Sequence, residues 1–213
     1  MKIGILGAGN VGGALGRGWA KAGHEVFYGV REPGKPEVRQ LVAEITAAGG
    51  KARAGTVAEA AAFGEVAVLT VPWKAAQQAL AEAGDLAGKV LLDAVNPLKA
   101  DLSGLDTGSD TSAGEQVASW APGARVVKIF NTTGANNMAD PHYPEGQATL
   151  LYCGDDAAAK AVAGTLAADL GFDPVDAGPL ASARLLEPFA LLWISLAYGQ
   201  GLGRNFAFRL MRR

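Results

Sequence analysis

The sequence predicts an α/β fold in which helices cover both faces of a doubly wound, mainly parallel sheet. Three observations support this fold class. Short apolar runs alternate with helical patterns through most of the chain, as expected for strands joined by helical crossovers. A glycine-rich turn directly follows the first apolar run, Lys2–Leu6. The run Val66–Val71 is apolar throughout, which is typical of a strand that is buried on both faces of a parallel sheet.

The glycine-rich turn, 7–12, is the strongest motif in the chain. Gly7, Gly9 and Gly12 have the G-x-G-x-x-G spacing, between a strand and a helical pattern at 13–22, and a second strand follows at 25–28. In this context Gly7 permits the tight turn, Gly9 lets the backbone approach a pyrophosphate, and Gly12 lets the helix pack close to the strand. The helix N-terminus, with its free N–H groups, favours the phosphates. The motif predicts a dinucleotide site of the Rossmann type, rather than a glycine-rich turn that binds nothing.

The end of the second strand indicates which dinucleotide binds. Sites that prefer NAD usually have an acidic residue there, about twenty residues beyond the glycines. Gly29 and Val30 occupy that position in this chain, and Arg31 follows. A guanidinium group binds a 2′-phosphate through paired hydrogen bonds, and Lys35 adds a second positive charge. The sequence therefore favours NADP(H), although Glu32 would approach the ribose if the strand ended one residue later.

The remaining elements follow from capping signals and hydrophobic periodicity. Gly49 and Gly50 end one helix, Thr56 caps the next, and Ser112 with Glu115 forms a capping box. We expect further helices at 37–48, 59–63, 74–83, 112–120, 157–170 and 181–198, and further strands at 51–54, 66–71, 89–95, 125–130, 148–153 and 173–176. The alternation becomes looser near residue 133. This change predicts a Rossmann domain at 1–133 and a smaller C-terminal domain, an α/β extension, at 134–213.

Three loops are expected to meet at the carboxyl ends of the strands, where open α/β sheets bind their ligands. These loops are Val71-Pro72-Trp73, Asn96-Pro97-Leu98 and Asn131–Asn137. A proline after a strand is also common without any function, so each loop alone is a weak signal. Together the loops predict a three-loop shelf beside a bound nicotinamide.

No side chain of the chain is an evident proton donor for a ketone or imine reductase, which needs a placed acid. His24 precedes the second strand at the wrong end of the sheet, and His142 is more typical of a surface loop. Lys128 and Asn131 have the Lys-x-x-Asn spacing that β-hydroxyacid dehydrogenases place on a helix. The apolar neighbours of Lys128 instead predict a buried strand, in which the two side chains would point to opposite faces. We expect no catalytic side chain and no metal site, which suits hydride exchange with a second redox cofactor.

The composition fits a globular protein of a reducing compartment. The chain has 213 residues, 49% hydrophobic content and a formal net charge of −2, which gives no basic field for nucleic acid. Its one cysteine, Cys153, lies in an apolar run and is expected to be a buried structural thiol. The apolar start is the first strand rather than a signal peptide, and the segment Pro188–Gly199 is too short to span a bilayer. We expect a cytoplasmic protein that binds no membrane.

The chain resembles the coenzyme F420-dependent NADP oxidoreductase family along its whole length. The segments that match are Gly7–Gly12, Tyr28–Arg31, Val71–Trp73, Val95–Leu98, Lys128–Thr132, Ala177–Leu180 and Arg184–Glu187. The resemblance implies a Rossmann domain with a small C-terminal domain, a homodimer, and hydride transfer between NADPH and the deazaflavin ring of F420.

The resemblance also implies roles for individual residues. Gly9, Asn10, Val11 and Arg31 would bind NADP. Val71, Pro72, Trp73, Asn96 and Pro97 would flank the nicotinamide, and Asn131, Thr132, Thr133, Gly134 and Ala135 would lie beneath the partner ring. The family usually has serine before the arginine, where this chain has Val30.

Two other functions are compatible with the same motifs. The domain also occurs in ferric and flavin-linked membrane reductases, so an NADPH-dependent reductase of FMN or FAD, or a reductase of the ferric type, is the alternative. A non-catalytic module that senses NADP is the further alternative, and the three-loop shelf argues against it.

Overall fold

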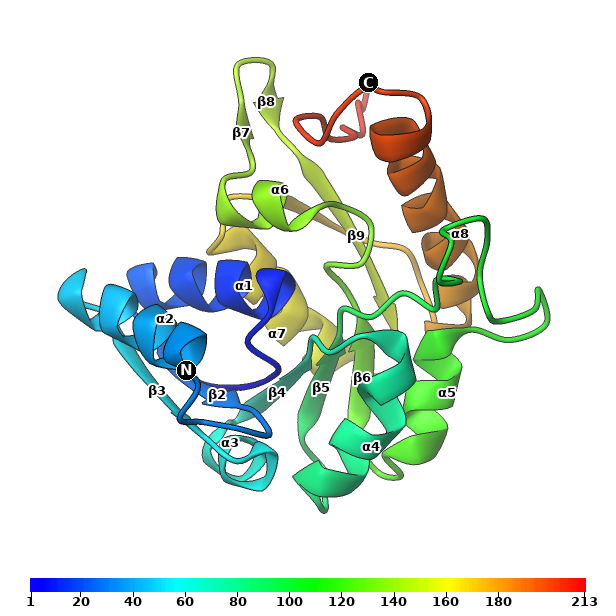
Figure 1. Ribbon diagram of the computed structural model, residues 1–213. Coiled ribbons are helices and arrows are strands. Elements are labelled where there is room, and N and C mark those ends of the chain that lie inside the picture. Colours follow the sequence, from blue (N-terminus) through cyan, green and yellow to red (C-terminus); the bar gives the residue numbers. More distant parts are fainter.

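The computed structural model describes residues 1–213 and contains one eight-stranded sheet with the strand order β10-β9-β6-β5-β4-β1-β2-β3 (Figure 1). The strands are β1 (Lys2–Leu6), β2 (Glu25–Gly29), β3 (Lys51–Gly55), β4 (Val66–Leu69), β5 (Val90–Asp93), β6 (Arg125–Lys128), β9 (Thr149–Gly154) and β10 (Asp173–Asp176). All neighbouring pairs are parallel except β6 and β9. The expected mainly parallel, doubly wound sheet is therefore confirmed.

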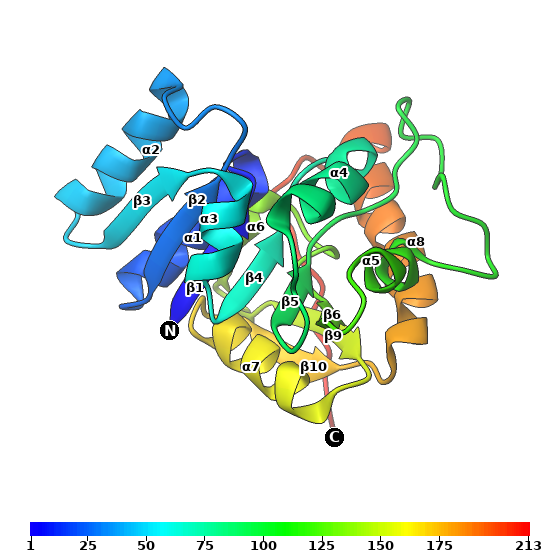
Figure 2. The same ribbon diagram turned by 90° about the horizontal axis from the view of Figure 1, so that it is seen from below.

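The helices cover both faces of the sheet (Figure 2). They are α1 (Asn10–Lys21), α2 (Pro36–Ala47), α3 (Val57–Phe63), α4 (Trp73–Ala83), α5 (Ala113–Trp120), α6 (Ala135–Ala139), α7 (Ala157–Ala168) and α8 (Ala183–Ile194). One cluster of 27 buried residues joins α1, α2 and α7 to one face. A second cluster of 18 joins α3, α4 and α5 to the other face, so the sheet is buried on both sides.

The C-terminal segment continues the same sheet. β9 runs antiparallel to β6, and β10 pairs with β9 at the sheet edge. The first buried cluster includes residues from α1 and α7, and the indole of Trp19 donates a hydrogen bond to the Leu166 carbonyl at 2.9 Å. The C-terminal residues therefore form an α/β extension that shares its core with the N-terminal part, and the division at residue 133 stays a prediction.

The capping residues act as the sequence indicates. The Thr56 hydroxyl accepts a hydrogen bond from the Glu59 N–H, and the Glu59 carboxylate accepts one from the Thr56 N–H, which is a complete capping box. At α5 the Ser112 hydroxyl accepts from the Glu115 N–H, but it also donates to the Glu115 carboxylate at 2.7 Å. Ser112 therefore caps α5 as expected, but the capping box predicted there is incomplete, because the Glu115 carboxylate binds the Ser112 hydroxyl and not its N–H.

The sequence missed two small elements between β6 and β9. Helix α6 begins at Ala135, within the expected loop, and a hairpin of β7 (His142–Tyr143) and β8 (Gly146–Gln147) follows. Neither element is long enough to show a periodic pattern. The strand β6 also ends two residues earlier than expected, at Lys128, and Phe130 adopts a positive φ of 65°.

The helical run near the C-terminus agrees with the expected helix at 181–198 to within one residue at each end. It begins with the 3₁₀ turn Leu180–Ser182, includes α8, and ends with the π turn Ser195–Gly199. The 20 residues Leu180–Gly199 have a mean hydropathy of 1.4 and are long and apolar enough to cross a membrane, so the length argument made from Pro188 is wrong. In the structure, Leu186, Ala190 and Trp193 are buried against the rest of the chain. The same composition is typical of a helix packed on a domain.

Cys153 is a buried thiol on β9, as expected, because its side chain is 0% exposed. Burial raises the pKa of the Cys153 thiol to about 12.

The thiolate is the reactive form, so we expect the native protein to react with a disulfide reagent at pH 8 at least about 100-fold more slowly than the unfolded chain. Thiol release in buffer and in urea measures this ratio. Equal rates would show that Cys153 is accessible in the native protein.

Candidate functional site

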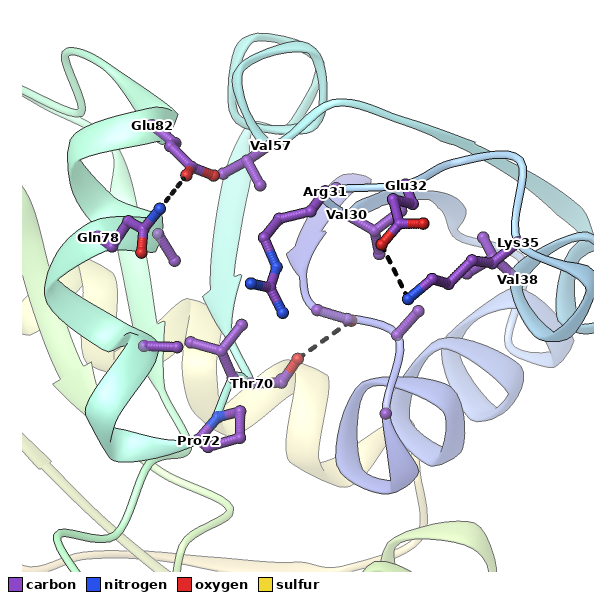
Figure 3. Close-up of a pocket in the computed structure, with 17 residues that line it drawn as sticks. Val30, Arg31, Glu32, Lys35, Val38, Val57, Thr70, Pro72, Gln78 and Glu82 are labelled. Carbon is purple, nitrogen blue, oxygen red and sulfur yellow. Dashed lines mark hydrogen bonds and ion pairs between the residues drawn. The ribbon is translucent and has the colours of Figure 1, made fainter.

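A cavity of about 350 Å³ opens at the carboxyl ends of β1, β2 and β4 (Figure 3). It is lined by the glycine-rich turn, the loop after β2, the end of β4 and one side of α4. Its lining residues are Gly7, Ala8, Gly9, Gly29, Val30, Arg31, Glu32, Lys35, Val38, Val57, Thr70, Val71, Pro72, Ala75, Gln78, Ala79 and Glu82. The cavity is therefore in the place where the sequence predicts a dinucleotide.

The glycine-rich turn depends on the absence of side chains. Gly7 has φ 116°, and a Cβ atom there would meet the Thr70 hydroxyl at 2.9 Å. A Cβ atom on Gly12 would collide with the Gly7 carbonyl, so α1 can approach β1 only with glycine at this position. Thr70 also holds the turn directly, because its hydroxyl lies 3.0 Å from the Leu6 carbonyl and 3.2 Å from the Gly7 carbonyl. The structural roles expected for Gly7 and Gly12 are confirmed.

The N-terminus of α1 is open toward a ligand. Gly9 occupies the N-cap position, and no side chain caps the first N–H groups of the helix. A Cβ atom built on Gly9 has nothing within 4 Å, so the backbone is free to approach a ligand. Asn10 and Val11 form the first turn of α1 and are not among the residues that line the cavity. The free N–H groups and the positive end of the helix dipole favour phosphate here.

Glycine at position 29 excludes a ribose-binding acid at the end of β2. A Cβ atom at Gly29 would lie 2.8 Å from the Ala60 Cβ and 2.9 Å from the Val57 Cα. Both distances are below those that real Cβ atoms show, so an aspartate at Gly29 would require α3 to move. The strand β2 ends at this residue.

Arg31 presents the free positive charge of the cavity. Its side chain points into the cavity and makes no hydrogen bond or ion pair with other residues (Figure 3). Lys35 also lines the cavity, but its ammonium lies 2.9 Å from the Glu32 carboxylate. Glu32 is therefore paired with Lys35 rather than placed alone beside a ribose. Of the two cations predicted at this site, Arg31 is the one without a protein partner.

The residues of the three-loop shelf have different surroundings. Val71 and Pro72 line the cavity, whereas Trp73 stacks on Trp120 with the ring centroids 5.1 Å apart. Asn96 and Asn131 join two of the loops. The Asn96 amide donates to the Asn131 carbonyl at 2.7 Å, and the Asn131 amide donates to the Asn96 side-chain oxygen at 3.1 Å. Pro97 follows Asn96 in the loop, outside the lining of the cavity.

The rest of the loop after β6 is tied to the C-terminal segment. Thr132 is buried, and Thr133 accepts a hydrogen bond from the Asn137 amide at 2.8 Å. Gly134 is the N-cap of α6, which Ala135 begins. The Asn137 amide also donates to the Phe206 carbonyl at 2.7 Å. The end of the chain therefore holds this part of the shelf in place.

A buried ionic cluster lies behind the shelf. The Lys128 ammonium is 3.0 Å from the Asp93 carboxylate and 2.9 Å from the Glu187 carboxylate, and all three side chains are at most 1% exposed. Glu187 also accepts hydrogen bonds from the N–H groups of Ala113 and Gly114 at the start of α5. The cluster thus joins β5, β6, α5 and α8.

The protonation of Lys128 follows from these contacts. Burial disfavours the ammonium form, but the Coulomb attraction of Asp93 and Glu187 outweighs it and raises the pKa of Lys128 above its ordinary value. The charge is enclosed and fully paired, and the side chain does not line the cavity beside the glycine-rich turn. The expectation of a buried strand at Lys128 is confirmed.

The expectation that Lys128 and Asn131 point to opposite faces is wrong. Both reach α8, because Lys128 pairs with Glu187 and the Asn131 amide donates to the Leu186 carbonyl at 3.2 Å. Strand alternation does not extend to Asn131, since β6 ends at Lys128 and Phe130 has a positive φ.

Both histidines lie away from the cavity. The His24 Nε2 is 2.9 Å from the Asp169 carboxylate, and its Nδ1 is 3.1 Å from the N-terminal amine. His142 lies on the β7–β8 hairpin, its side chain is 72% exposed, and it contacts Asp140. Neither side chain lines the cavity.

Sequence reasoning missed one side of the cavity, which α4 provides. Ala75, Gln78, Ala79 and Glu82 all line it. Their spacing places them on one face of a helix that begins directly after Pro72. That spacing, together with the position of α4 after a central strand, is the signal that could have found them.

The fold is of the Rossmann type, and the similar proteins below make the chain an oxidoreductase that uses NADP. Residues 2–97 match the family described as NADP oxidoreductase, coenzyme F420-dependent. An F420-dependent NADP reductase of Methanothermobacter marburgensis is 36% identical over 208 residues, which cover 92% of both proteins. The chain belongs to this family of coenzyme F420-dependent NADP oxidoreductases.

Two further proteins are similar to this chain, one in structure and one in sequence. A crystal structure of a proposed F420-dependent NADP reductase from Arthrobacter sp. FB24 is 35% identical, superposes with a TM-score of 0.89, and the match covers 100% of both chains. The metalloreductase STEAP3 of Rattus norvegicus is 32% identical over 196 residues, which cover 89% of this chain and 36% of that protein.

We expect the substitution Lys128→Met to destabilise the protein by about 3–5 kcal/mol, because it leaves the carboxylates of Asp93 and Glu187 buried without a cation. Urea unfolding measures this change. The triple variant Lys128→Met/Asp93→Asn/Glu187→Gln should recover part of the loss, since it buries no charge. A single variant as stable as the wild type would contradict the pairing.

Proposed function

We propose that the protein transfers a hydride between NADP(H) and coenzyme F420, in the cleft at the carboxyl ends of the strands, without a side chain that donates or accepts a proton. The observation that carries the NADP part is the unpaired Arg31 in a cavity where Gly29 leaves no space for an acid. The F420 part is supported by the relative from Methanothermobacter marburgensis.

The residues present fit NADP. The open N-terminus of α1 at Gly9 would hold the pyrophosphate, and Arg31 would bind the 2′-phosphate. The Lys35 ammonium would bind the same 2′-phosphate as Arg31 once the phosphate displaces the Glu32 carboxylate from it. Val71 and Pro72 belong to the first loop of the shelf and also line the cavity. They would position the nicotinamide, which supplies the hydride when it is bound.

The chemistry of the shelf supports transfer without a protein acid. The polar side chains within its three loops are amides, hydroxyls and one indole, none of which titrates near neutral pH: Asn96, Asn131, Asn136, Asn137, Thr132, Thr133 and Trp73. Lys128, three residues before Asn131, is enclosed by its carboxylate partners, and the exposed Lys74 and Lys99, which follow the other two loops, do not line the cavity. The role of this chain is then to hold two redox cofactors in position and to exclude water.

We expect anaerobic NADPH oxidation with F420 as the acceptor, little oxidation with FMN or FAD, and little activity with NADH. Absorbance of the nicotinamide and of F420 follows the reaction. Turnover with flavins alone would show a flavin reductase instead. Tight NADPH binding without turnover of any acceptor would show a non-catalytic NADP module.

The substitution Arg31→Gln tests the phosphate site. It removes a charged donor, and charge-assisted hydrogen bonds contribute about 1.5–3 kcal/mol, so the Kd of NADPH should rise about 10- to 100-fold. The Kd of NADH should change little. Calorimetric titration measures both values, with Arg39→Gln as the control, since Arg39 lies on α2 outside the cavity. Equal losses for NADPH and NADH would contradict the role of Arg31.

We also propose that the protein forms a homodimer through the outer face of α8. Leu185 and Leu192 lie seven residues apart on one face of this helix and are 72% and 50% exposed. The family resemblance implies two subunits, and burial of such side chains against a second copy would stabilise the pair.

Light scattering after size exclusion tests the dimer. The wild type should have the mass of two chains, and the double variant Leu185→Glu/Leu192→Glu should have the mass of one. Met211→Glu is the control, because Met211 is 87% exposed but lies outside α8. A monomeric wild type would contradict the proposal.

A further inference from the structure

The side of the cavity formed by α4 carries a feature that phosphate binding does not explain. Gln78 and Glu82 both line the cavity, and the Gln78 amide donates a hydrogen bond to the Glu82 carboxylate at 2.8 Å (Figure 3). The dinucleotide proposed for this cavity is a polyanion. A carboxylate in such a cavity lowers affinity unless it meets a hydrogen-bond donor of the ligand.

The position of this pair corresponds to the base of the adenosine half. In sites of this type the pyrophosphate lies at the glycine-rich turn and the ribose at the end of β2, which is Gly29 here. The cavity continues from Gly29 past Val57 to α4, and Arg31 points into the space between β2 and α4. A base attached to the ribose would occupy this space.

The lining of this space suits a flat, uncharged ring. Ala75 and Ala79 expose only methyl groups on the face of α4, and Val57 provides an apolar surface from α3. The Arg31 guanidinium is planar and stacks on aromatic rings. Only Gln78 and Glu82 provide polar atoms on α4 within the cavity, so they would meet the edge of the ring.

We propose that Glu82, oriented by Gln78, recognises the 6-amino group of adenine and so determines the base specificity of the dinucleotide. This inference rests on the proposed NADP site and extends it. The carboxylate accepts a hydrogen bond from the amino group. In hypoxanthine an oxygen atom replaces that group and N1 carries a hydrogen, so donor and acceptor exchange places along this edge. A carboxylate placed for the amino group would then face an oxygen, and the base would bind less tightly in this position.

A surface pair of the same kind provides a matched control. Gln40 donates to the Glu44 carboxylate at 2.9 Å with the same four-residue spacing on α2, and neither residue lines the cavity. If Gln78 and Glu82 only stabilised a solvated helix face, the substitutions Glu82→Gln and Glu44→Gln would have the same effect on the preference between the two bases.

The experiment compares the binding of NADP⁺ and of its hypoxanthine analogue by calorimetry, without any acceptor. We expect the wild type and Glu44→Gln to bind NADP⁺ about 10-fold more tightly than the analogue. Glu82→Gln should reduce this ratio to about 1–2, because its amide can donate to the hypoxanthine oxygen. The ratio is insensitive to the general gain in anion affinity that follows from the loss of one negative charge.

Two results would overturn the inference: equal affinities of the wild type for the two dinucleotides, or an unchanged ratio in Glu82→Gln. A variant that unfolds would be detected by circular dichroism, and Glu82→Asp then replaces it, with an expected loss of NADP⁺ affinity and a reduced ratio. Failure of F420 reduction would overturn the proposed reaction and leave the base ratio intact. Absence of any dinucleotide binding would overturn both.

Discussion

The close contact between the glycine-rich turn and β4 is the constraint on which the rest of the site depends. Gly7 and Gly12 allow α1 to approach β1 with no side chain between them, and Thr70 bonds the turn from the neighbouring strand. This contact fixes the direction of α1, so that its uncapped N-terminus points at the carboxyl ends of the strands. The cavity, the phosphate site and the first loop of the shelf all take their positions from it.

The buried cluster around Lys128 has a similar role on the other side of the sheet. It joins two strand ends to α5, which lies between the two strands in the sequence, and to α8, which lies far from them. Asn131 is fixed by the same helix through the Leu186 carbonyl. Because a buried charge without its partner is strongly destabilising, such a cluster permits little variation in how α8 packs against the strands. The shelf is therefore positioned by charges that do not themselves reach the cavity.

The cavity has different chemical groups in different parts of its lining. One end offers N–H groups and the Arg31 guanidinium, which suit phosphate. The α4 end offers a carboxylate and an amide, which suit a neutral base with a hydrogen-bond donor. The cavity thus offers different groups for the phosphates and for the base of the proposed ligand.

Local sequence signals predicted most of the regular structure. The strand Lys2–Leu6, the caps at Thr56 and Ser112, and the glycine-rich turn depend on neighbouring residues, and the structure agrees with each of them. The sequence was less informative after β6, where α6 and the β7–β8 hairpin are too short to show a period. It did predict the helical run at 181–198 to within one residue at each end, although the 3₁₀ and π turns at its two ends are not visible as a pattern.

By itself, the sequence determined the fold class and the family and predicted NADP(H), because each rests on short motifs of residues that are close together in the chain. The tertiary structure alone decided which charges are free. It left Arg31 unpaired in the cavity, paired Lys35 with Glu32, and enclosed Lys128 between two carboxylates. It also brought α4 to the cavity and linked Asn96 to Asn131. These contacts join segments that are distant in the sequence, so no local pattern specifies them.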